Sequence, residues 1–181
     1  MKKIYMVLLA AILLNANSFA QKGKNQLGFG ADLSLPTSDF GNYFKTGAGG
    51  YVKGMLGVGK AGQVTVTTGY SSFKEAGDWE DFTTTVTIVP LLFGYRHNFN
   101  GFFVEPQLGY GIYGAKVTDF QEGFYTESGG AFTWAAGVGY LFSNQIEVSA
   151  RYQSGGQQGT LFNLFGLRLG YNFSLGGSKS K

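Results

Sequence analysis

The sequence contains few of the side chains that usually carry catalysis or bind metal ions. His97 is the only histidine, and cysteine is absent. A histidine can serve as the base of a nucleophilic triad when a serine and a carboxylate lie within reach. His97, however, closely follows Tyr95 beside a short turn, which indicates a histidine at the rim of the structure. Without cysteine, neither a disulfide framework nor a thiolate metal site can form.

Two other patterns resemble binding motifs only superficially. Asp78, Glu80 and Asp81 could offer carboxylate oxygens to Ca²⁺, but the segment lacks the glycine and final glutamate of a calcium-binding loop. A solvated acidic loop is the favoured interpretation. The Gly-x-Gly pairs at 28–30 and 109–111 are not followed by an expected helix, so they do not indicate phosphate binding. We therefore predict no catalytic residue, no metal site and no cofactor.

The composition indicates a folded chain rich in β-structure. The 181 residues include 17% aromatic residues, 30 glycines and only 14% charged residues. Typical proteins have about 25% charged residues and about 7% glycine. Disordered chains are charged and poor in aromatic residues, and so much glycine and aromatic content disfavours a helical bundle. The length suits one domain.

The N-terminal segment, residues 1–20, has the features of a secretory signal peptide. Two lysines precede an apolar run over 4–14, and Ser18 and Ala20 are small residues before a cut at Gln21. The alternative is a permanent anchor, but the run is shorter than the roughly 20 residues that span a bilayer. Because no cysteine follows the cut, a lipoprotein anchor is not indicated. Removing the segment nearly balances the charges, which gives no support to a nucleic-acid partner.

The rest of the chain alternates between apolar and polar residues, the pattern of β-strands with two different faces. Pro36 is expected to end the first strand, and Pro90 to mark a bulge that shifts the phase of the fourth. The eight alternating segments are 26–35, 46–59, 64–73, 83–99, 102–116, 131–142, 145–154 and 161–175. Short connections at 60–63, 98–101 and 143–144 alternate with longer ones at 36–45, 74–82, 117–130 and 155–160. This alternation of short and long connections predicts an up-and-down meander of antiparallel strands.

The distribution of charge and aromatic rings decides which face points outward. The apolar faces carry the rings, which an eight-stranded barrel has too little internal space to hold. Facing outward, they would meet lipid, and closure would satisfy the backbone as hydrocarbon requires. The sequence therefore predicts an all-β, eight-stranded antiparallel up-and-down transmembrane β-barrel. Its lumen would hold a charge network of Lys53, Arg96, Glu105, Glu147, Arg151 and Arg168, with Asp32 as a further contributor.

Rings near the strand ends would form two aromatic belts at the membrane interfaces, although aromatic residues are also simply good strand formers. Glycine recurs beside tyrosine, as at 69–70, 109–110 and 170–171. A glycine beside an outward ring leaves an inward gap and permits tight curvature.

Together, the N-terminal segment, the eight segments, the alternating connections and the aromatic end of the last strand resemble small outer-membrane β-barrels of the OmpA/OmpX type. The resemblance covers 26–175 and rests on architecture. It departs at the C-terminus, where such barrels often end on an aromatic residue but Phe173 is followed by eight further residues. The implied organisation is a signal peptide at 1–20, a periplasmic lead at 21–25, the barrel at 26–175 and a polar tail at 176–181.

The resemblance implies a protein of the Gram-negative outer membrane, with lipids including lipopolysaccharide around a monomer. We expect a non-enzymatic structural or surface-interaction role, with a carbohydrate or protein as the surface ligand. The alternatives are a narrow channel, a lipid-modifying barrel enzyme and a soluble lipocalin-like carrier. Most acidic residues fall in the longer connections, which would face the exterior. The expected loop interaction surface comprises Trp79, Phe82, Phe120, Phe124 and Tyr125.

Overall fold

Eight strands and one short helix make up the computed structural model, which describes residues 25–77, 82–119, 123–143, 145–157 and 160–175. The strands are β1 (Gln26–Thr37), β2 (Gly47–Val58), β3 (Gly62–Lys74), β4 (Phe82–Phe99), β5 (Phe102–Asp119), β6 (Gly123–Leu141), β7 (Ile146–Gln157) and β8 (Thr160–Ser174). The helix is α2 (Ser38–Tyr43). No helix among the described residues is long and apolar enough to cross a membrane.

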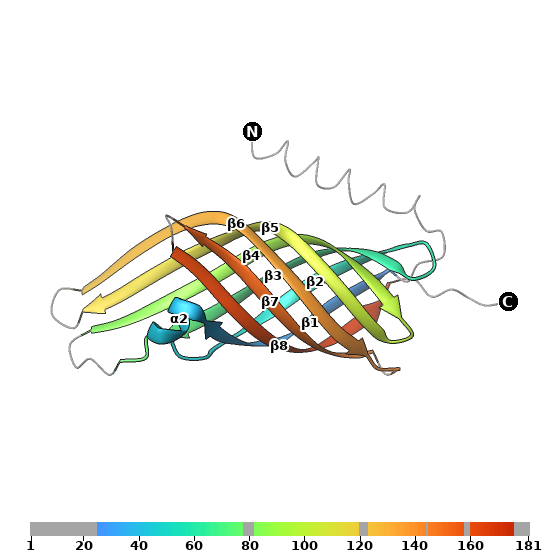
Figure 1. Ribbon diagram of the computed structural model, residues 1–181, viewed down its shortest axis with the longest axis horizontal. Helices are drawn as coiled ribbons and strands as arrows, with labels where there is room; N and C mark the ends of the chain where they lie inside the picture. The colour runs from blue at the N-terminus through green and yellow to red at the C-terminus, as the bar shows by residue number, and fades with distance from the viewer. Residues whose placement is uncertain (1–24, 78–81, 120–122, 144, 158–159, 176–181) are drawn as a thin grey trace, which may run out of the picture.

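The strands form a closed antiparallel barrel in which each pairs with its neighbours in the chain, and β1 closes the sheet against β8 (Figure 1). The predicted fold class is confirmed. Because Gln26 pairs with Ser174, the barrel begins and ends at the same end of the cylinder. We call this the terminal end, and it also holds the connections from β2 to β3, from β4 to β5 and from β6 to β7. The opposite, far end holds α2 and the other connections.

The far end differs from the prediction in the lengths of its connections. β5 continues to Asp119 and β6 begins at Gly123, so only 120–122 lies between them. The expected long connection at 117–130 is therefore wrong. The connection at 155–160 likewise shortens to 158–159. Strands that continue beyond lipid need no apolar outer face, so their polar residues resemble a loop in the sequence.

The two prolines singled out in the sequence, Pro36 and Pro90, do not have the expected effects on their strands. β1 continues through Pro36, which pairs with Leu164 of β8 after the pairing with β2 has ended at Ser34. Pro90 produces no bulge, because the register of β4 is the same on both sides of it. Only the β3 ladder is interrupted there, since proline has no N–H to donate.

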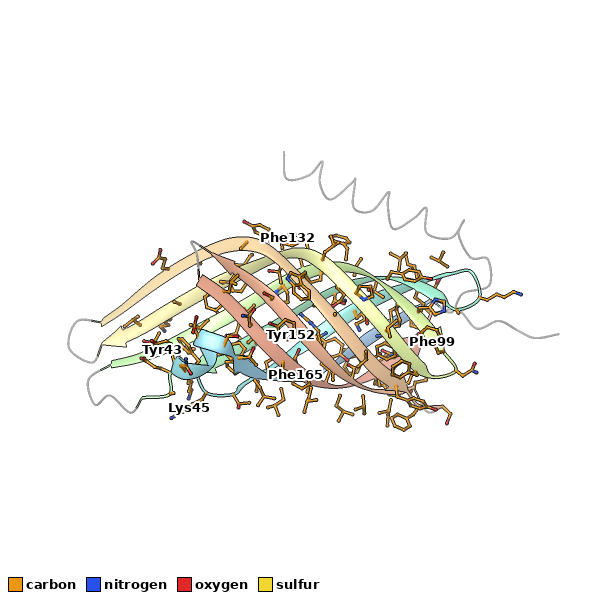
Figure 2. All side chains as sticks on the ribbon, viewed as in Figure 1. Tyr43, Lys45, Phe99, Phe132, Tyr152 and Phe165 are labelled. Atoms are coloured by element: carbon orange, nitrogen blue, oxygen red, sulfur yellow. The ribbon has the colours of Figure 1, made fainter. Side chains whose placement is uncertain are left out.

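The predicted orientation of the two faces holds around the barrel. Large apolar side chains such as Phe29, Leu91 and Leu167 are exposed on the outside, while Thr65, Glu147 and Arg168 are buried inside. A lipocalin-like carrier would need the opposite facing, so that alternative is wrong. Figure 2 shows the side chains around the strands, with Phe99 near the terminal end and Tyr43 and Lys45 near the far end.

The expectation that the outer face carries the rings has five exceptions among the described residues, which are buried inside: Phe40, Tyr51, Phe73, Phe103 and Tyr113. Inward glycines make the room they need. A Cβ on Gly47 would contact the ring of Phe73, one on Gly139 would contact Phe103, and one on Gly170 would contact Tyr51. The barrel therefore holds bulky rings because the facing positions carry no side chain.

Candidate functional site

Buried charges fill the half of the interior toward the terminal end. Glu105 of β5 accepts a hydrogen bond of 2.8 Å from Lys53 Nζ and bonds of 3.2 and 2.9 Å from Nε and Nη2 of Arg96. Thr65 and Gln107 donate to its second oxygen at 2.8 and 2.9 Å. These groups come from β2, β3, β4 and β5, so the carboxylate joins four strands across the lumen.

Glu147 of β7 forms the second half of the same cluster. Arg96 donates to it through Nη1 and Nη2 at 2.8 and 3.1 Å, and Asn172 donates at 2.9 Å. Lys53 Nζ lies 3.5 Å from its Oε1 atom. The side chains of Arg96 and Glu147 have no exposed surface. The cluster contains two cations and two carboxylates, so its buried charge is balanced, as stable burial requires.

Aromatic rings lie against two of the buried arginines, Arg96 of the cluster and Arg168. Cζ of Arg96 lies 3.7 Å from the centre of the Phe103 ring, and Cζ of Arg168 lies 4.5 Å from that of Tyr51. A guanidinium over a ring face is attracted to the ring's negative quadrupole. Neither ring was assigned to the site from the sequence, although the phase of Tyr51, two residues from Lys53, indicates an inward position.

The six lumen charges expected from the sequence thus divide into three groups. Lys53, Arg96, Glu105 and Glu147 form the cluster just described. Arg168 pairs separately with Asp32, its Nε donating to Oδ2 at 2.7 Å, and Ser34 donates to the other carboxylate oxygen at 2.7 Å. Arg151 is buried and borders the same small space as Arg168 and Asp32, and its Nε and Nη1 atoms have no hydrogen-bond partner among the described residues.

Apolar side chains fill the interior toward the far end. Phe40 of α2 contacts the rings of Phe73 and Phe162, with centroids 5.4 and 5.0 Å apart. We call the buried group Phe40, Phe73, Val86, Ile88, Tyr113 and Leu164 the interior plug. The sequence pattern did not reveal this group, because neither the helix α2 nor rings inside the barrel were expected.

The remaining predicted site residues lie elsewhere or are not described. Trp79 and Phe120 fall outside the described residues. Phe82, Phe124 and Tyr125 belong to the ends of β4 and β6 rather than to loops, and their side chains are also outside the description. The described residues contain no group of three or more histidines, cysteines or carboxylates that could hold a metal ion.

His97 lies at the terminal end among aromatic residues. Its Nδ1 atom is 3.4 Å from the Tyr95 hydroxyl oxygen, and its ring centroid is 4.5 Å from that of Phe99. These contacts suit a histidine in an aromatic belt, because such rings have both an apolar body and a polar edge.

Comparison with known proteins supports this architecture. A family model described as "Outer membrane protein beta-barrel domain" matches residues 6–173. The structure of Ail, the attachment invasion locus protein of Yersinia pestis, aligns with a TM-score of 0.64 at 16% identity, covering 84% of this chain and 100% of that one. Ail has also been solved with the heparin analogue sucrose octasulfate.

Two further barrels are similar. The N-terminal β-barrel domain of Pseudomonas aeruginosa OprF has a TM-score of 0.56 at 17% identity, covering 84% of this chain and 100% of that one. Neisserial surface protein A has a TM-score of 0.50 at 15% identity, covering 83% and 97%. These likenesses establish the fold. A search of curated protein sequences gives no match.

The buried cluster generates a prediction about stability. Glu147→Gln should lower the free energy of unfolding by about 3 kcal/mol, because it leaves cations buried with fewer counter-charges. Urea unfolding of the protein folded into lipid vesicles measures the change. The control is Glu127→Gln, which alters an exposed carboxylate near the far end and should change stability by less than about 0.5 kcal/mol. Equal small effects would show that the cluster does not stabilise the barrel.

Proposed function

Since this chain belongs to the family of outer-membrane protein β-barrel domains, and so resides in the outer membrane of a Gram-negative cell, we propose that it is a sealed, non-enzymatic barrel with a surface-interaction role. The observation that carries this proposal is the filled interior. The charged cluster occupies one half and the interior plug the other. The site inside the barrel therefore holds the structure together, and surface interactions would take place outside it.

The filled interior argues against a narrow channel. Between the charged cluster and the interior plug lies a space of about 20 Å³, bordered by Asp32, Ile88 and Arg151 among others. A single water needs about 10–15 Å³ by this kind of measure. A space of this size has no room for a passing solute.

A lipid-modifying enzyme also receives little support. Such chemistry needs a base within hydrogen-bond reach of a nucleophile. The described residues bring no serine or carboxylate into a hydrogen bond with His97, whose contacts are Tyr95 and Phe99. The role we infer needs no catalytic group.

The far end is where we expect surface interactions. β4, β5 and β6 have 18, 18 and 19 residues against 12 in β1, and their ends extend beyond the rest of the barrel (Figure 1). We propose that these extended ends of β4, β5 and β6 face the cell exterior. There, Trp79, Phe82, Phe120, Phe124 and Tyr125 would contact a carbohydrate or protein ligand. Ail, described as an attachment protein and solved with a heparin analogue, supports this assignment.

A row of lysines suits contact with lipopolysaccharide. Lys45 donates its backbone N–H to the carbonyl of Lys74, and Lys74 and Lys116 both pair with Thr85, so the three lie in one row across the sheet with Thr85 between Lys74 and Lys116. All three side chains are exposed. Lys74 is four residues beyond the exposed ring of Tyr70, about 13 Å along the strand. Because strands of such barrels tilt by about 35–45°, Lys74 stands about 10 Å above this ring, at the level of lipid phosphates just beyond the aromatic belt.

A first experiment tests the sealed lumen. Liposomes containing the folded protein should swell in isotonic small sugars no faster than empty liposomes, because the filled interior leaves no path. Liposomes with an open porin provide the positive control. Swelling that rises with the amount of folded protein would favour the narrow channel.

A second experiment tests the orientation. Because the chain lacks cysteine, Gly77→Cys and Lys60→Cys each create a single thiol at an exposed position, one at each end of the barrel. A membrane-impermeant maleimide on intact cells should label position 77 alone, and position 60 should react only after the outer membrane is opened. The reverse labelling pattern would place the extended ends of β4, β5 and β6 in the periplasm.

A third experiment tests the lysine row. The double substitution Lys74→Gln/Lys116→Gln should weaken binding of purified lipopolysaccharide roughly 30-fold, since each lysine near an anionic surface contributes about 1 kcal/mol. Lys60→Gln, which removes an exposed lysine from the terminal end, should leave binding unchanged. Similar losses in both variants would mean that the row is not a specific contact.

A further inference from the structure

Arg151 is a buried cation whose hydrogen-bonding needs the described residues do not meet. It lies on β7, pairs across the sheet with Gly137 and Gly166, and is only 6% exposed. Its Nε and Nη1 atoms are buried and have no hydrogen-bond partner among the described residues. A guanidinium cannot escape this cost by losing its proton, so it needs acceptors supplied from elsewhere.

The charge balance of the interior points in the same direction. The charged cluster is neutral, and Asp32 neutralises Arg168 through a bond of 2.7 Å. Arg151 then remains as one positive charge in excess among these buried side chains. Glu75, toward the far end, pairs with Phe44 in an isolated bridge and lies outside this group. A buried charge without a counter-charge is strongly disfavoured.

The space described above, of about 20 Å³, adjoins this charge. Arg151 borders it together with Arg168, Ser34, Gln153, Ile88 and Gly166. Asp32 also borders it, but its two oxygens already accept bonds from Arg168 and Ser34. The volume fits one particle of about the size of a water molecule, and it excludes sulfate, phosphate and organic carboxylates.

We propose that the barrel binds one monatomic anion, chloride in physiological media, against the guanidinium of Arg151. A water molecule could accept a hydrogen bond from Arg151 but would leave the positive charge uncompensated. A halide supplies both the acceptor and the counter-charge. The site is independent of the surface role, because it lies beneath the interior plug.

Bromide identifies the occupant directly. Crystals of the folded protein grown in sodium bromide should show an anomalous peak within hydrogen-bond distance of Nε or Nη1 of Arg151. Absence of a peak there, with water or a carboxylate of the chain in its place, would overturn the proposal. This measurement uses the unaltered protein and does not depend on a variant that folds.

The unfolding rate of the barrel in vesicles provides a second, independent test. At constant ionic strength, replacing gluconate by 300 mM chloride should slow urea-induced unfolding of the vesicle-embedded barrel by about tenfold, as expected for a ligand that binds only the folded state. Arg151→Met should abolish this dependence, since it removes the charge and both unpartnered donors.

Lys60→Met is the matched control, because it removes an exposed cation from the terminal end and should keep the full chloride effect. An unaltered protein without chloride dependence, or a dependence retained by Arg151→Met, would show that Arg151 does not bind the anion.

Discussion

The closure of β1 against β8 is the constraint on which the rest of the structure depends. Twelve residue pairs, from Gln26 with Ser174 to Thr37 with Asn163, turn an open meander into a cylinder. In hydrocarbon an open sheet edge would leave backbone groups without partners, at several kcal/mol each. Closure removes the edges, but it also fixes a small interior. Every inward side chain must then find its space and its partners inside that volume.

Two kinds of complementarity fill this interior. Rings lie opposite glycines, as Phe103 lies against Gly139 and Tyr51 against Gly170, so bulky side chains fit without widening the barrel. Charges lie opposite charges, as in the cluster around Arg96 and Glu147. Ring–glycine pairs occur toward both ends, since Phe73 lies against Gly47 toward the far end, whereas the charge pairs gather toward the terminal end. Together they explain why a lumen that is barely wide enough for side chains can hold both arginines and phenylalanines.

The sequence could predict the fold and the facing of the charges because a period of two reports directly which face a residue occupies. Lys53 and Glu147 were both assigned to the lumen on this basis. The period does not report register, so it could not show that Arg96 meets Glu147, 51 residues away, or that Arg168 meets Asp32 instead. Nor could it reveal α2, because six residues are too few for a recognisable helical pattern.

The buried charges have their largest effect on the register in which neighbouring strands pair. A slip of one residue would turn every apolar side chain of a strand inward, and the hydrophobic pattern alone rejects it. A slip of two residues keeps both faces correct, so the pattern cannot exclude it. Such a slip moves Glu147 by about 7 Å along β7, far enough to break its bonds of 2.8 to 3.1 Å with Arg96. The cost of an unpaired buried charge then separates the native register from an alternative with the same two faces.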